Sequence, residues 1–256
     1  MRTGKVLSFV VMVVMLFATL SLGAQDKQGT VVSLEFQKPK NGMVRQYEDG
    51  RKQKMEWHKQ QKDSQALFVW ETMTGPETGT YVVGRFGQHW ADLDKPSVPD
   101  QADLDEYRKA IGGYVESMVA RYYEFLPKIS NPGDSTTPSK FGEILTFRVR
   151  YGRNSDFRSA ITRVHDAGEK TKWPVNYFWY ELASGGNTGT FVLVLPRNSW
   201  ADFEDKPDVK PFRDMLKDAF GQAEADSILD RIDHSVESET SDIVQFRADL
   251  SYMPAK

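Results

Sequence analysis

The chain has 256 residues, with 33 Lys or Arg against 36 Asp or Glu, and a formal net charge of −3. A balance this close to neutral argues against a nucleic-acid-binding protein, because phosphate binding needs clustered basic residues. The chain has no cysteine, which excludes disulfides, thiol nucleophiles and cysteine-based zinc sites.

The first residues have the layout of a targeting segment. Arg2 and Lys5 are basic, the run from Val6 to Leu22 has no charge, and small residues follow before the chain turns polar. This layout is typical of a secretory signal peptide. We predict that residues 1–24 are such a peptide and that the protein is exported, to a periplasmic or extracellular location. An uncleaved anchor is the alternative, although about 17 apolar residues is short for a membrane span.

Residues 30–131 predict one unit of the order strand, helix, strand, strand, helix, strand. Strands are expected at 30–37, 66–73, 79–86 and 120–130, and helices at 43–61 and 105–117. In the strand segments apolar and polar residues alternate with period two. In the first helix the residues expected to be buried recur at helical spacing. Pro127 lacks a backbone donor, so we expect the last of these strands to be an edge or irregular strand.

Residues 142–256 predict a second unit of the same order, after a linker at 132–141. Strands are expected at 144–151, 176–183, 190–196 and 242–253, and helices at 155–168 and 210–236. The residues from Thr78 to Leu93 align without a gap with Thr188 to Phe203, and seven of sixteen positions are identical. Agreement in several segments in the same order indicates an internal duplication.

The repeated segment ends in Trp-Ala-Asp in both copies. We expect Asp92 and Asp202 to cap backbone N–H groups of the following turn. We expect Trp90 and Trp200 to fill the core beneath that turn, and a ligand role for them is the alternative.

The two units resemble a known superfamily in their hairpins and flanking strands. The hairpin residues are Trp70, Glu71 and Gly75 in the first copy and Tyr180, Glu181, Gly185 and Asn187 in the second. With the strands "LTFRVRYG" and "TFVLVL" they resemble the dimeric α/β-barrel superfamily, and are most similar to its NIPSNAP-like branch, over most of residues 30–254. The resemblance implies an α+β fold, with two tandem ferredoxin-like βαββαβ repeats packed sheet to sheet as an intramolecular barrel. It also implies a monomer, because the fused copies supply each other's partner surface.

The resemblance implies little about function, because the superfamily includes monooxygenases, haem enzymes, lyases and proteins of unknown role. Related barrels sometimes bind haem through a helical histidine, and His165 and then His234 are the residues to test. No cofactor is predicted otherwise, and no metal site, since no H-x-x-x-H or H-E-x-x-H pair occurs.

Alternation sorts the strand residues onto two faces and predicts a binding site. We expect Leu34, Phe36, Phe68 and Val82 to pack against helices. The opposite, mixed face is then the barrel interior, and it carries the predicted ligand-binding residues Glu71, Arg85, Arg148, Trp179, Glu181 and Arg247. Buried charges are costly unless paired. The sequence therefore favours non-catalytic binding of a small molecule, with an internal salt-bridge network as the alternative for the same residues. The resemblance gives a haem- or oxygen-handling, monooxygenase-like enzyme as the first alternative function. A structural or interaction protein of the cell envelope, assembling through free strand edges, is a further alternative.

Overall fold

The computed structural model describes residues 29–134 and 137–254. The strands are β1 (Val31–Pro39), β2 (Phe68–Thr72), β3 (Tyr81–Gln88), β4 (Val115–Phe125), β5 (Phe141–Val149), β6 (Phe178–Ser184), β7 (Thr190–Arg197) and β8 (Val236–Phe246). The helices are α1 (Val44–Gln60), α2 (Asp100–Ala110), α3 (Asn154–Thr171), α4 (Phe212–Phe220) and α5 (Gln222–Ser235). The predicted signal peptide lies outside the described residues. None of the helices in the described ranges has the length and hydropathy of a membrane-spanning segment.

The eight strands form one closed antiparallel barrel in the order β1-β3-β2-β8-β5-β7-β6-β4. Each half of the chain supplies four neighbouring strands. The halves are joined by hydrogen bonds at two seams, β2 with β8 and β4 with β6. The predicted α+β class and barrel architecture are confirmed. β4 pairs with both β1 and β6, so it is not the predicted edge strand, and Pro127 lies just beyond its end.

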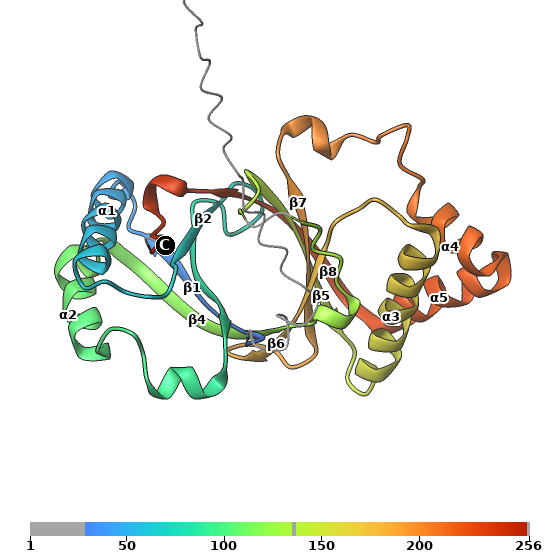
Figure 1. The fold of residues 1–256 in the computed structure, drawn as a ribbon, viewed down its shortest axis with the longest axis horizontal. Helices are drawn as coiled ribbons and strands as arrows, with labels where there is room; N and C mark the ends of the chain where they lie inside the picture. The colour runs from blue at the N-terminus through green and yellow to red at the C-terminus, as the bar shows by residue number, and fades with distance from the viewer. Residues whose placement is uncertain (1–28, 135–136, 255–256) are drawn as a thin grey trace, which may run out of the picture.

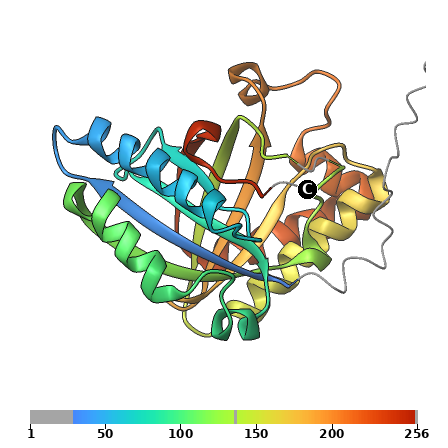
Figure 2. The ribbon, with the colours of Figure 1, turned by 60° about the vertical axis from the view of Figure 1, so that its left-hand side comes forward.

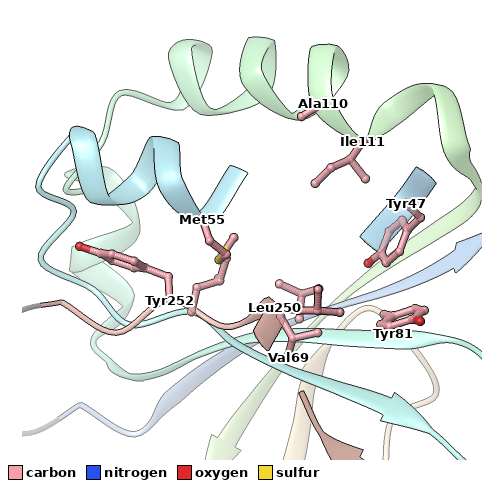
Figure 3. Packing of buried hydrophobic residues seen from close by; sticks show 10 residues of the cluster. Tyr47, Met55, Val69, Tyr81, Ala110, Ile111, Leu250 and Tyr252 are labelled. Carbon is pink, nitrogen blue, oxygen red and sulfur yellow. The ribbon is translucent and has the colours of Figure 1, made fainter. Parts of the chain in front are cut away.

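The helices lie outside the barrel, on two opposite sides (Figure 1). α1 and α2 cover the strands of the first half, and α3, α4 and α5 cover those of the second (Figure 2). Apolar clusters fill the space between helices and strands. In the first half Tyr47 and Met55 of α1 and Ile111 contact Val69 and Tyr81 of the sheet (Figure 3).

The two halves interlock through the segments that follow their last strands. Ile129, after β4, belongs to the apolar cluster of the second half, whereas Leu250, after β8, belongs to that of the first. The backbone N–H of Trp179 donates to the Ser130 hydroxyl at 2.8 Å, and that of Val69 donates to the Ser251 hydroxyl at 2.9 Å. Each half therefore completes the core of the other.

Several predicted boundaries shift. The helix expected at 105–117 spans 100–110, and β4 already begins at Val115. The long helix expected at 210–236 is two helices, because Gly221 at φ 83° breaks it. The last strand begins earlier than expected and ends at Phe246, which leaves Arg247 in a following turn.

The two Trp-Ala-Asp turns are only partly as predicted. Asp92 accepts the His89 N–H at 2.7 Å, and Asp202 accepts the Asn198 N–H at 2.8 Å, so the capping role is confirmed. Trp90 and Trp200 are 46% and 55% exposed, so the prediction that they fill the core is wrong. Both rings instead lie on aromatic neighbours near the end of the barrel.

Candidate functional site

The interior of the barrel is hollow. It belongs to a cavity of about 2010 Å³ that is lined by strands of both halves and continues beneath the loop that leads into α4. Val119 and Phe86 face this space and keep 45% and 37% of their surface exposed, although they lie in or beside barrel strands. An eight-stranded barrel is either filled by its own side chains or has room for one small ligand. This barrel is of the second kind.

Aromatic rings cluster in the barrel at both seams between the halves. At the β2–β8 seam, the rings of Phe68, Trp70, Phe86 and Phe246 lie with centroids 5.7–6.3 Å apart. At the other seam, the Phe125 ring lies 5.4 Å from that of Tyr180 and 6.3 Å from that of Phe178. Such surfaces suit flat apolar groups, because tilted and edge-to-face ring pairs at these separations are favourable.

The predicted assignment of the two sheet faces was wrong for β1, β2 and β3. Leu34, Phe36, Phe68 and Val82 line the barrel cavity, whereas Val69 and Tyr81 pack beneath the helices. The prediction assumed that the more apolar face of the strands packs against the helices. In the first half the helix-covered layer is unusually polar, because α1 buries Arg51, Lys54 and His58 on the side that faces the sheet. These polar residues at helical spacing were the sequence signal that could have shown which face of the strands α1 covers.

None of the six predicted ligand residues lines the barrel cavity. Glu71 and Arg247 come together, but on the outer side of the sheet. Arg247 Nη1 lies 2.8 Å from Glu71 Oε2 and 2.6 Å from Glu48 Oε1, and the Tyr81 hydroxyl donates to Glu48 at 2.7 Å. The contacts of Glu48 with Arg247 and Tyr81 hold its pKa below the usual range against the opposing effect of burial.

The other four candidates also lie in structural contacts. Arg158 pairs with Glu181. Trp179 is buried in the core of the second half, with its ring 5.6 Å from that of Phe147. The remaining two pairs are Arg85 with Asp63 at 3.2 Å and Arg148 with Glu237 at 3.0 Å. The geometry therefore supports the salt-bridge alternative for the charged members of the predicted set.

Two charged side chains that the sequence reasoning missed do face the cavity. Arg121 of β4 and Asp242 of β8 both line it, and Arg121 Nε and Asp242 Oδ1 are buried without a hydrogen-bond partner in the described structure. The Arg121 guanidinium lies 4.7 Å from the Phe36 ring, a cation–π distance. Burial, aided by the charge of Glu77, raises the pKa of Asp242.

Arg121 and Asp242 occupy equivalent places in the two halves. Arg121 pairs with Leu34 of β1, and Asp242 pairs with Ile144 of β5, which stands 110 residues after Leu34. Each lies beneath a hairpin glycine of the opposite half, Gly185 over Arg121 and Gly75 over Asp242. A cavity with matching walls therefore carries a cation on one side and an acid on the other. If the strand faces had been assigned correctly, the alternation in β4 and β8 together with the repeat offset would have identified this pair.

Histidines do not face the cavity. The residues lining it include none of His58, His89, His165 and His234. His165 Nδ1 lies 3.0 Å from the Tyr177 hydroxyl beneath α3, and His234 Nδ1 lies 2.6 Å from the Asp230 carbonyl oxygen. Burial also raises the pKa of Tyr180, which disfavours the phenolate form that binds iron. The lining therefore does not fit a haem held through histidine.

Within residues 29–134 and 137–254 there is no group of three or more His, Cys, Asp or Glu side chains arranged to hold a metal ion.

Solved structures share this architecture at low sequence identity. A candidate monooxygenase from Lactobacillus acidophilus NCFM has a TM-score of 0.52 at 8% identity, over 89% of this chain and 98% of that one. A chlorite dismutase from Candidatus Nitrospira defluvii has a TM-score of 0.51 at 8% identity, over 87% and 94%. An anthrone oxidase-like protein has 0.51 at 10%, over 88% and 94%. This chain has the dimeric α/β-barrel fold. No known family description matches the sequence, and no curated protein matches it. The likeness shows the fold alone, because function depends on sites rather than on folds.

Proposed function

We propose that the protein binds one small, largely apolar molecule inside its barrel, without catalysis. The observation that carries the proposal is the hollow, aromatic-walled cavity enclosed by strands of both halves. Ligand sites are typically apolar cavities with a few placed polar groups. The lining contains no histidine or cysteine, the side chains most used as bases and nucleophiles, which favours binding over chemistry.

Arg121 and Asp242 are proposed to orient the ligand. An unpaired buried donor on Arg121 suits an anionic or acceptor group, and an unpaired acceptor on Asp242 suits a donor group. The preferred ligand then has an aromatic or aliphatic body with an acidic group at one end and a donor at the other. The two halves have similar walls, so this charge difference is what distinguishes one orientation from the reverse.

The origin and location of the chain are part of the same proposal. We infer export from the signal-like residues 1–24, and descent from a duplicated unit of the NIPSNAP-like branch. Equal strand order and matching register in the two halves support the duplication. A monomer is expected, because the barrel is already closed within one chain.

Native mass spectrometry of the protein exported by its own host tests the proposal. We expect the mass of the chain from about residue 25 together with a discrete non-covalent adduct. The double variant Arg121→Met, Asp242→Asn should lose the adduct, whereas Arg148→Met, which changes an exposed ion pair, should keep it. A bare chain in every preparation would contradict the binding proposal. A haem-sized adduct would instead favour an oxygen-handling enzyme of this fold.

A further inference from the structure

A second, smaller pocket lies on the other side of the first-half strands, beneath α1 and α2. Its volume is about 350 Å³, and its lining includes Glu35 of β1, Arg51 of α1 and Tyr107 of α2. Exposed residues of the loop before α2, among them Pro96 and Ser97, also line it, so it reaches the surface there. Leu34 and Arg121 line both this pocket and the barrel cavity, whereas Glu35, Arg51 and Tyr107 line only this pocket.

Arg51 is the outstanding residue of this pocket. It is 1% exposed, and its Nε and Nη2 atoms have no hydrogen-bond partner among the described residues. A buried donor without a partner costs about 1–3 kcal/mol, and more when the group is charged. Nε and Nη2 form one edge of the guanidinium plane, the edge that binds the two oxygens of a carboxylate side by side.

The other strongly charged side chains around Arg51 already have partners. Lys54 Nζ lies 2.8 Å from Asp103 Oδ1, and Arg85 Nη1 lies 3.2 Å from Asp63 Oδ2. The Glu35 carboxylate accepts the Gln37 amide at 2.6 Å. Arg121 also lines this pocket with its Nε unpaired, but Arg51 differs from it in being fully buried with both Nε and Nη2 unpaired in the described ranges of the chain.

The second half shows that the fold does not require this polarity. At an offset of 110, Glu35, Gln37, Arg51 and Arg85 correspond to Leu145, Phe147, Ile161 and Leu195. Phe147 and Ile161 belong to an apolar cluster of the second half, with Leu145 and Leu195 packed against it. One copy of the unit closes over an apolar layer, so the charged layer of the other copy is not a requirement of the fold.

We propose that the pocket beneath α1 and α2 binds a small organic monocarboxylate, whose two oxygens accept hydrogen bonds from Arg51 Nε and Nη2. A single negative charge fits best, because Glu35 also lines the pocket and would repel a dianion. The volume of about 350 Å³ is at the small end of ligand pockets. Arg51 lines this pocket and not the barrel cavity, so either proposal can fail without the other.

Isothermal titration calorimetry with acetate and with pyruvate, against sodium chloride at equal ionic strength, tests this site. We expect saturable binding of a carboxylate by the mature protein. Loss of two charge-assisted hydrogen bonds should weaken it by at least about 10-fold in Arg51→Met. Arg51→Lys keeps the charge but cannot form the bidentate pair of hydrogen bonds, so it should bind the carboxylate with intermediate affinity. Asp242→Asn, at a residue that lines the barrel cavity but not this pocket, should bind as the unaltered protein does.

Three results would overturn the assignment. They are no carboxylate binding in the millimolar range, equal binding by the unaltered protein and the Arg51 variants, and a response to chloride as large as that to carboxylate. Arg51→Lys retains the long side chain and the charge, so it decides the question even if Arg51→Met does not fold. Loss of barrel ligand in Asp242→Asn with retained carboxylate binding would show that the two sites are independent.

Discussion

The two halves form the same unit, but the layer of side chains between helices and sheet is polar in the first half and apolar in the second. Beneath α1 and α2 the first half holds Arg51, His58 and Asp63 with almost no exposure. Beneath α3 the second half holds Phe157, Ile161 and Phe191, also with almost none. The strand order is the same in both, and so is the register apart from a shift between Val31 and Ser33 of β1. The comparison teaches that strand pairing and helix placement do not specify the polarity of the layer between them.

Hydrogen bonding makes the polar layer tolerable. The Tyr47 hydroxyl donates to Gln37 Oε1 at 2.9 Å, and Gln37 donates in turn to Glu35. In the second half the equivalent residues, Phe157 and Phe147, simply pack ring on ring at 5.6 Å. A satisfied polar network can replace apolar packing, but each member then depends on its partners.

The largest expected effect is the removal of a ring from the apolar layer. Phe157→Ala should lower the free energy of unfolding by about 3–5 kcal/mol, because the Phe157 side chain is fully buried and its loss leaves a cavity. Tyr47→Phe, at the equivalent position, should cost only about 1 kcal/mol for one lost hydrogen bond. Urea denaturation measures both, and equal costs would contradict the proposed difference between the layers.

Removing a charge from the polar layer should have the next largest effect. Burial tends to raise the pKa of Asp63, but His58, the Ser97 hydroxyl, the Gln65 N–H and Arg85 together hold it well below its usual range. Asp63→Asn should cost about 3 kcal/mol at neutral pH, because Arg85 and His58 lose their partner.

The same carboxyl should make stability depend on acid. A folded-state pKa below the unfolded value of about 3.9 stabilises the fold above that value and ceases to do so as pH falls through the folded pKa. The stability of the unaltered protein should therefore fall more steeply below about pH 5 than that of Asp63→Asn. Parallel acid-unfolding curves for the two proteins would show that Asp63 is not the group responsible.

The two hairpin glycines give a smaller and graded effect. Gly185 has φ 94° and a Cβ there would clash with the Ala120 carbonyl oxygen, whereas at Gly75, with φ 81°, it would meet the Asp242 side chain. Backbone atoms move aside less readily than side-chain atoms. Gly185→Ala should therefore lower the free energy of unfolding by about 2–3 kcal/mol, and Gly75→Ala by less. Gly79→Ala, at φ 80° with open space around it, isolates the conformational cost of about 1 kcal/mol. Thermal unfolding that ranks Gly79→Ala as the most destabilised would refute this order.

The smallest effect is expected at the barrel rim. Arg148 and Glu237 are each about half exposed, so solvent screens their attraction. Arg148→Met should change the free energy of unfolding by less than about 0.5 kcal/mol. A loss above 1 kcal/mol in the same urea experiment would mean that this pair contributes to joining the strands.

Prediction from the sequence succeeded for elements and failed for faces. The strands, the hairpins and the repeated unit followed from periodicity and turn residues, which are local properties. Phe68 and Phe36 were placed on the wrong side because alternation shows which residues share a face, but not which face a helix will cover. Arg121 was missed for the same reason, although it shares a face with Tyr123 and Val119 within one strand.

By itself, the sequence determined the βαββαβ order, its recurrence at a fixed offset and the capping turns at Asp92 and Asp202. Those depend on contacts between residues close in the chain. Tertiary structure alone decided that the barrel is hollow, that Arg121 and Asp242 face the same cavity, and that Arg51 is buried without a partner. These depend on contacts between strands and helices far apart in the chain, where a shift of one residue would exchange the inner face for the outer.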